Sequence, residues 1–256
     1  MHTKRTRFKK EIVCEFLPPT RKLKHDKVII FCPGMPGSPF KKEVMGFWAK
    51  KGYWVFLLRY RGSWESGGSF LKISPHQDVL DVVEGISRGF KDIYSGEMLK
   101  LDPKKIYVFG SSFGGPAALL ASPDKRITKV VVSSSVADWT KESKVERLDW
   151  LFAFTKEAFG EAYRFDKKDW KKLKTGKFYN PVNKIESLDP KKIMMIHAKD
   201  DDIVLYNPVE QFAKELGCEL YSLKKGGHLS SSCFTKPKFL KKIEKFLKGK
   251  DTPSKR

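Results

Sequence analysis

Short apolar runs alternate with amphipathic stretches along most of the chain. Strand-like runs occupy residues 7–16, 27–32, 53–60, 105–109, 127–132, 192–197 and 219–223, and the run at 53–60 is nearly apolar throughout. Apolar residues recur at helical spacing in residues 40–51, 76–98, 114–121, 208–216 and 236–247. Strands without polar alternation are typical of a sheet that is covered on both faces. The alternation therefore predicts an α/β fold with a mostly parallel, doubly wound sheet.

The regular alternation is interrupted once. Between residues 139 and 179, aromatic residues lie among many lysines without a clear period. We interpret this segment as an insertion, with residues 1–138 and 180–256 forming one α/β core. A chain of 256 residues suits a single domain of this class, and no internal repeat or low-complexity linker divides it.

Charge is the unusual feature of the composition. The chain has 51 Lys and Arg against 30 Asp and Glu, a net charge of +21, which invites a nucleic-acid or membrane-surface interpretation. The lysines are spread over both termini and the insertion, however, and no helix-turn-helix, zinc finger or RNA-binding aromatic motif is present. We expect no specific nucleic-acid partner, and a non-catalytic basic binding protein is the alternative. No apolar run approaches the roughly 20 residues that span a bilayer.

The cysteines indicate a reducing environment. Cys14, Cys32, Cys218 and Cys233 are far apart in sequence, and no CxxC pair is present, so we predict free thiols without a disulfide or a zinc site. The basic N-terminus is followed by a strand-like run and not by the apolar stretch of a signal peptide. These features favour a cytoplasmic protein.

Residues 105–115 carry the clearest chemical signal. An apolar strand leads into Gly110-Ser111-Ser112-Phe113-Gly114, and a helix of small residues follows. This is the context of a nucleophile elbow, in which a serine lies on a strained turn and a Cβ on either glycine would collide with neighbouring backbone. Ser112 is the candidate nucleophile, and Ser111 fills the variable position before it.

A serine hydroxyl needs a general base, and the base needs an acid that orients it. Asp200, Asp201 and Asp202 follow the strand at residues 192–197, at the sheet edge where catalytic groups gather. His228 lies after two glycines in the loop that follows the last strand. The order serine, aspartate, histidine is the one expected with this elbow.

Four further histidines compete with His228 for the role of base. Each has a simple structural role, because it lies in a basic terminal stretch, opens a helix or ends a strand. These residues are His2, His25, His76 and His197.

Together these motifs resemble the α/β-hydrolase superfamily over residues 7–247. His197-Ala198-Lys199-Asp200-Asp201-Asp202-Ile203-Val204 is similar to the family pattern His-Gly-x-x-Asp-x-x-Val, with Ala198 in place of glycine. That register implies that Asp201 is the acid, and Asp200 and Asp202 stay open as alternatives. The resemblance also places the base at His228.

The same resemblance implies an oxyanion hole made of two backbone N–H groups. One belongs to Phe113, the residue after the nucleophile. The other belongs to Met35, because Pro33-Gly34-Met35-Pro36-Gly37 is similar to the family sequence His-Gly-x-x-Gly, with Pro33 in place of histidine. An ordinary Pro-Gly turn is the alternative interpretation of this segment.

Two loops resemble small esterases and the prolyl-oligopeptidase-like branch. Residues 59–68 are similar to the family loop Tyr-Arg-Gly-x-Gly-x-Ser. We expect Tyr60 and Arg61 to brace this loop, and a substrate contact is the alternative. Residues 136–139 resemble the same branches of the family. Too few residues precede the first core strand for the large propeller of the oligopeptidases. We therefore expect a serine hydrolase with an acyl-enzyme intermediate, a carboxylesterase acting on small or medium acyl esters. A small peptidase or a thioesterase is the alternative.

The resemblance finally implies that the insertion forms a helical cap after the sixth strand. Its aromatic residues would line an acyl pocket, or alternatively hold the cap to the core. The expected partner is a small-molecule acyl substrate, and the chemistry requires no metal or organic cofactor. The sequence does not indicate an oligomeric state.

Overall fold

In the computed structural model, which describes residues 2–21, 26–38 and 41–249, the core is one twisted sheet. Within these residues eight strands follow the order β1-β2-β4-β3-β7-β8-β9-β10. They are β1 (Lys4–Phe8), β2 (Ile12–Leu17), β3 (Lys27–Cys32), β4 (Trp54–Leu58), β7 (Lys105–Ser111), β8 (Ile127–Ser133), β9 (Ile193–Ala198) and β10 (Glu219–Leu223). Only the β1–β2 and β2–β4 pairs among them are antiparallel. The predicted mostly parallel sheet is confirmed.

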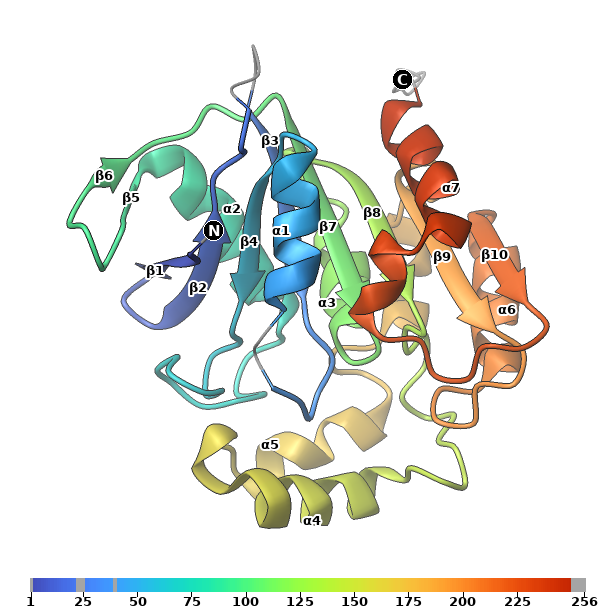
Figure 1. Cartoon of the computed structure of the whole chain (residues 1–256). Coiled ribbons are helices and arrows are strands. Elements are labelled where there is room, and N and C mark those ends of the chain that lie inside the picture. Colours follow the sequence, from blue (N-terminus) through green and yellow to red (C-terminus); the bar gives the residue numbers. More distant parts are fainter. Residues whose placement is uncertain (1, 22–25, 39–40, 250–256) are drawn as a thin grey trace.

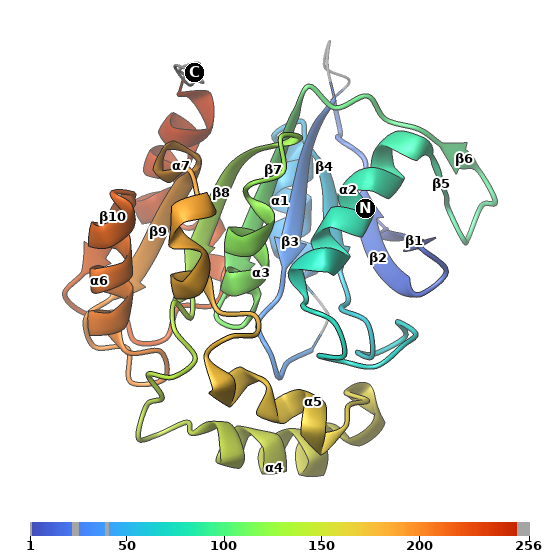
Figure 2. The same cartoon turned by 180° about the vertical axis from the view of Figure 1, so that it is seen from behind.

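Helices cover both faces of this sheet (Figures 1 and 2). One face carries α1 (Lys42–Lys50) and α7 (Pro237–Lys248), and the other carries α2 (His76–Arg88), α3 (Gly114–Ala121) and α6 (Tyr206–Leu216). Neighbouring residues of β7 enter different apolar cores, Val108 on the α2–α3 side and Phe109 on the α1–α7 side. Burial on both faces explains why the strands lack polar alternation. None of the helices in the described ranges is long and apolar enough to span a membrane.

Two predicted elements have different boundaries in the structure. The run at residues 7–16 is a hairpin of β1 and β2, turned by Lys9 and Lys10, which both have positive φ. The helix expected over residues 76–98 ends at Arg88, because Gly89 has a φ of 115° that a helix cannot contain. A short hairpin of β5 (Phe90–Lys91) and β6 (Met98–Leu99) follows. Helix α1 lies within the predicted range 40–51. Residue 40 is outside the residues that the structure describes.

Strand register brings the carboxyl ends of the central strands to one edge. Cys32 pairs with Gly110, Ser111 pairs with Ser133, and Ser133 pairs with Ile196. The insertion lies beyond this edge (Figure 1) and contains α4 (Leu148–Phe159), α5 (Lys167–Lys171) and the 3-10 turns Gly160–Ala162 and Leu173–Thr175. Further 3-10 turns are Pro181–Ser187, Pro190–Lys192 and Ser231–Thr235. Loops from four strands and the insertion therefore meet in one place.

The four cysteines are free thiols, as predicted. Cys14, Cys32 and Cys233 are buried, and Cys218 is partly exposed.

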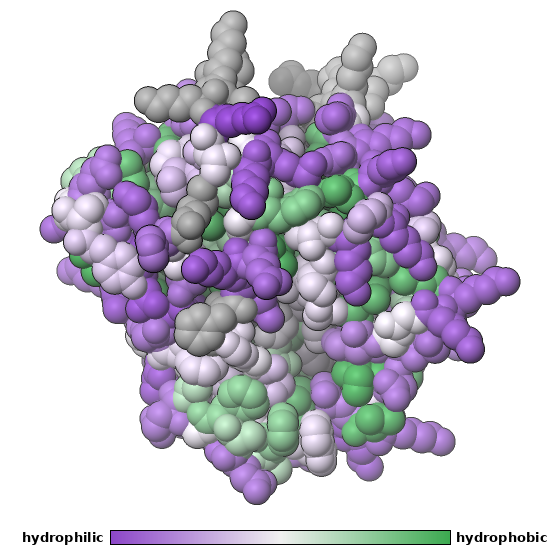
Figure 3. Space-filling model, viewed as in Figure 1, coloured by the Kyte–Doolittle hydropathy of each residue, from purple (hydrophilic) through white to green (hydrophobic). Residues whose placement is uncertain are grey.

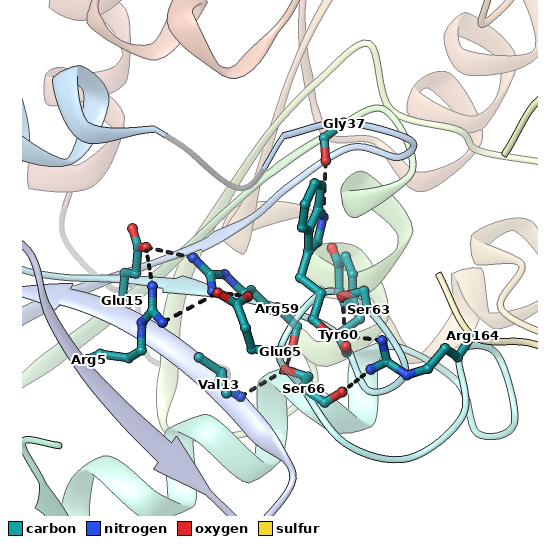
Figure 4. A network of polar contacts seen from close by, with 11 residues as sticks. Arg5, Val13, Glu15, Gly37, Arg59, Tyr60, Ser63, Glu65, Ser66 and Arg164 are labelled. Carbon is teal, nitrogen blue, oxygen red and sulfur yellow. Dashed lines mark hydrogen bonds and ion pairs between the residues drawn. The ribbon is translucent and has the colours of Figure 1, made fainter. Parts of the chain in front are cut away.

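A buried ion pair ties the N-terminal hairpin to the loop after β4. The guanidinium of Arg59, only 2% exposed, donates to Oε1 of Glu15 at 2.6 Å and also contacts Glu65 (Figure 4). Arg5 lies farther from both carboxylates, at 3.4 and 3.3 Å. Arg59 therefore provides the closer hydrogen bond to the buried carboxylate of Glu15.

We predict that Arg59→Met lowers the free energy of unfolding by about 3 kcal/mol, because the buried carboxylate of Glu15 then keeps only the longer contact with Arg5. Urea denaturation would measure the loss. Arg88→Met is the matched control: its exposed pair with Glu84 is expected to contribute much less, because solvent screens it. Equal losses in the two variants would show that the buried pair does not hold the loop.

Candidate active site

Ser112 lies at the turn between β7 and α3 with a left-handed backbone. Its φ is 51°, a conformation that costs a non-glycine residue free energy and that clusters at functional sites. Its N–H donates to the carbonyl oxygen of Ser133 at 3.0 Å, and its carbonyl oxygen accepts from Gly115 at 2.9 Å. The turn is thus fixed by the neighbouring strand on one side and by the helix on the other.

The glycines of the motif are required by close backbone approach. A Cβ on Gly110 would overlap the carbonyl group of Gly114, and a Cβ on Gly114 would overlap the carbonyl group of Cys32. A Cβ on Gly34 would lie 3.1 Å from the Cβ of Ser112. The elbow therefore packs directly against the end of β3 and the loop that follows it.

The structure brings Asp201 and His228 together. Nδ1 of His228 lies 3.1 Å from both carboxylate oxygens of Asp201. The aspartate side chain is fully buried, whereas that of His228 is 26% exposed. A buried carboxylate on Nδ1 holds the imidazole in the tautomer that leaves Nε2 free to accept a proton.

The two alternative aspartates occupy different places. Oδ1 of Asp200 accepts from the N–H groups of Gly226 and Gly227 at 2.8 and 2.9 Å, so this residue anchors the loop that carries His228. The sequence analysis leaves Asp200 open as an alternative acid and does not predict this anchoring role. Asp202 is exposed. Ser134 completes the anchoring, because its Oγ accepts from Leu229 at 2.8 Å.

His197 is a second partner of Asp201 that the sequence analysis did not identify. Its Nε2 lies 2.8 Å from the carbonyl oxygen of Val204 and 3.3 Å from Oδ2 of Asp201. Burial alone would raise the pKa of Asp201, but hydrogen bonds from His197 and His228 together hold it well below its usual range. The carboxylate therefore stays ionised beside His228.

The loop that carries Met35 is held by three aromatic side chains. The hydroxyl of Tyr60 donates to the carbonyl oxygen of Pro33 at 3.0 Å, and Nε1 of Trp64 donates to that of Gly37 at 3.2 Å. The N–H of Gly37 donates to the hydroxyl of Tyr163 at 3.2 Å. Polar contacts thus fix the loop on both sides of Met35.

The two expected oxyanion donors lie near Ser112. Within the described residues, neither the N–H of Met35 nor that of Phe113 donates a hydrogen bond to another protein group. The position of Phe113 is fixed because its carbonyl oxygen accepts from the hydroxyl of Tyr179 at 2.6 Å. Both N–H groups are therefore available to an acceptor at Ser112.

Two hollows meet at Ser112. The first, which we call the apolar hollow, has a cavity volume of about 50 Å³; its aliphatic walls are Val136, Leu148, Leu151, Val204, Leu205 and Val209. The second, the histidine hollow, is lined by His228, Gly34 and Lys41 among others. Met35, Ser112, Glu146 and Ile203 line both. A substrate carbonyl at Ser112 would therefore have one substituent in each hollow.

Most aromatic residues of the insertion pack among themselves or against the core. Phe152, Phe165 and Trp170 form one group, and Phe165 also contacts Phe70 of the core. Only a few reach a hollow, such as Trp139 in the apolar one and Phe154 in the histidine one. The stacked Trp150 and Phe154 are partly exposed on α4, where Figure 3 shows hydrophobic surface at the bottom. The aliphatic residues, and not the aromatic ones, make most of the apolar wall.

The other histidines lie elsewhere or have structural partners. His2 is exposed near the start of the chain, and Nδ1 of His76 lies 2.7 Å from the hydroxyl of Ser74. His25 lies outside the described residues.

Comparisons with known proteins identify a matching family. The sequence model of the prolyl oligopeptidase family matches residues 39–250. No curated protein sequence matches the chain.

Several solved structures share the fold. The acylaminoacyl peptidase of Pyrococcus horikoshii is 22% identical with a TM-score of 0.66; the match covers 100% of this chain but 43% of the peptidase. This chain therefore spans less than half of that enzyme. The esterase Pf2001 of Pyrococcus furiosus is 20% identical with a TM-score of 0.67, and 96% of this chain and 90% of the esterase are covered. The α/β hydrolase GrgF of Penicillium sp. sh18 is 18% identical with a TM-score of 0.67, and 93% of each chain is covered. The predicted α/β-hydrolase fold is confirmed.

We predict that a fluorophosphonate probe labels the wild type and not Ser112→Ala, because Ser112 is the serine on the strained elbow and lines the same hollow as His228. Gel fluorescence after a fixed labelling time would measure this. Ser111→Ala is the control, since it removes the adjacent buried hydroxyl and should keep the label. Labelling that persists in Ser112→Ala would remove this residue as the nucleophile.

We predict that Asp201→Asn destabilises the protein more at pH 6.5 than at pH 3. A carboxyl group whose pKa is depressed on folding stabilises the fold above its unfolded pKa, near 4, and this contribution is lost as the pH falls through the folded pKa. Urea midpoints at both pH values would measure the difference. Asp202→Asn, on an exposed side chain, should change little at either pH. A loss in Asp201→Asn that is the same at both would contradict the depressed pKa.

Proposed function

This chain belongs to the prolyl oligopeptidase family and is a serine hydrolase, and from that premise we propose that it is a carboxylesterase acting on small or medium acyl esters. The observation that carries the proposal is the position of Ser112, on a strained turn where an apolar hollow and the histidine hollow meet. The aliphatic walls suit an acyl chain of modest length.

The proposed reaction is acyl transfer through a Ser-Asp-His triad. His228 takes the proton of Ser112 as the hydroxyl attacks the ester carbonyl, and Asp201 orients the imidazole and stabilises its cation. The N–H groups of Met35 and Phe113 donate to the oxyanion of the tetrahedral intermediate. The alcohol then leaves with the proton from His228. Water, activated by the same histidine, hydrolyses the acyl-enzyme and frees Ser112. The reaction requires no metal or organic cofactor.

A small peptidase is the second candidate, and a thioesterase uses the same steps. The peptidase is favoured by one observation, the likeness to an acylaminoacyl peptidase over the whole of this chain. That likeness is one of fold, and it covers less than half of the peptidase. An ester requires less of the site than an amide does, because its leaving group is better.

The insertion is proposed to act as a cap that bounds the acyl site. Leu148 and Leu151 of α4 form one wall of the apolar hollow, and Val136 of the core lies in its lining as well. The free thiols agree with a proposed location in the cytoplasm.

We predict that the wild type hydrolyses p-nitrophenyl butyrate and hexanoate with a higher kcat/KM than the acetate or decanoate, and leucine p-nitroanilide at least about 100-fold more slowly. Leu205 tests the pocket, because it lines the apolar hollow but is 37% exposed, so its replacement disturbs the core little. Leu205→Trp should shift the preference toward acetate, and Leu205→Ala toward decanoate.

Steady-state rates across the ester series would measure both shifts. Ser112→Ala, assayed in parallel, corrects for spontaneous hydrolysis and trace contaminants. Faster turnover of the anilide than of every ester would favour the peptidase. Identical profiles in all three Leu205 forms would show that acyl chains do not enter this hollow.

A further inference from the structure

One carboxylate close to Ser112 has no hydrogen-bond or ion-pair partner among the residues that the structure describes. Glu146 precedes α4 and lines both hollows together with Ser112. Its backbone is fixed, because its N–H donates to Oγ of Ser143 at 2.8 Å. Its half-buried carboxylate forms no hydrogen bond or ion pair with any residue in the described ranges.

The neighbouring carboxylates are occupied by internal contacts. Oε2 of Glu142 accepts from the N–H of Leu148 at 2.8 Å, which supports the start of α4. Oδ1 of Asp138 accepts from Thr140 and from Asn180 at 2.9 and 3.0 Å. Glu146 differs from these wall residues because no local structural role uses its charge.

The cations of the two hollows do not neutralise Glu146. Lys141 lines the apolar hollow and Lys41 lines the histidine hollow, yet within the described residues neither forms an ion pair with this carboxylate. Burial raises the pKa of Glu146, while the charge of His228 lowers it. A partly desolvated carboxylate without a partner is unfavourable, and a bound cation would relieve that cost.

We propose that Glu146 binds the ammonium group of the substrate, and that the enzyme prefers acyl groups with a free amine next to the scissile carbonyl. This inference rests on the proposed esterase function and names its substrate class, aminoacyl esters. Glu146 lines both hollows where they meet at Ser112, so it is placed to bind a charge close to the reacting carbon. The carboxylate also gives a local preference for cations in a protein whose net charge of +21 repels them at long range.

The test compares leucine methyl ester with methyl 4-methylpentanoate, which has the same chain without the amine. We expect Glu146→Gln to lower kcat/KM for leucine methyl ester at least about tenfold, mainly through KM, and to change that for the uncharged ester less than about twofold. Glu157→Gln is the matched control, since it removes the same charge from an exposed position of α4. It should leave both substrates unchanged.

A pH series adds a second readout. In the wild type, the preference for leucine methyl ester should fall as the pH rises through the pKa of the amine, near 8, and in Glu146→Gln this dependence should be weak. If both esters respond equally to Glu146→Gln, or if Glu157→Gln lowers the preference as much, the ammonium site is refuted while the esterase stands. If the wild type hydrolyses neither ester and no other ester, the proposed function itself fails.

Discussion

The left-handed turn at Ser112 is the constraint on which the site depends. It forms only because Gly114 lets α3 approach the carbonyl group of Cys32, the last residue of β3. The loop that begins one residue later carries Met35, so the contact that shapes the nucleophile's turn also sets the starting point of the expected oxyanion loop. Adding a methyl group at Gly114 would move both at once.

The parts of the site that depend on nearby sequence could be predicted, and those that depend on distant contacts could not. The elbow is a local pattern of strand, glycines and helix, and Ser112 follows from it. The loop motif selected Asp201 only by resemblance, since three adjacent carboxylates look alike until His228 contacts one of them. The anchoring by Asp200 joins residues 26 positions apart. No local sequence pattern predicts a contact between residues this far apart.

The net charge describes the outer surface better than it describes the interior. Arg59 is buried against Glu15, and Arg61 pairs with Glu11, Asp78 and Asp81. Both arginines therefore stabilise the loop after β4. The hollows next to Ser112 contain Asp138, Glu142 and Glu146 as well as Lys41 and Lys141. A formal charge of +21 is thus a poor guide to the potential that a bound molecule would experience next to Ser112.

The contact between Tyr163 and Gly37 joins the insertion to the loop of Met35 across 126 positions of sequence. Backbone hydrogen bonds from Trp64 to Ala162 and from Arg164 to Gly62, both 2.7 Å long, join the insertion to the loop after β4, and Trp64 of that loop also donates to Gly37. The insertion is therefore not an interchangeable module. A chimera that received the corresponding segment of a relative would lose a support of the loop of Met35 unless a tyrosine came with it. During the evolution of related proteins, mutations in the insertion would then change substrate range and turnover together, because this segment affects both.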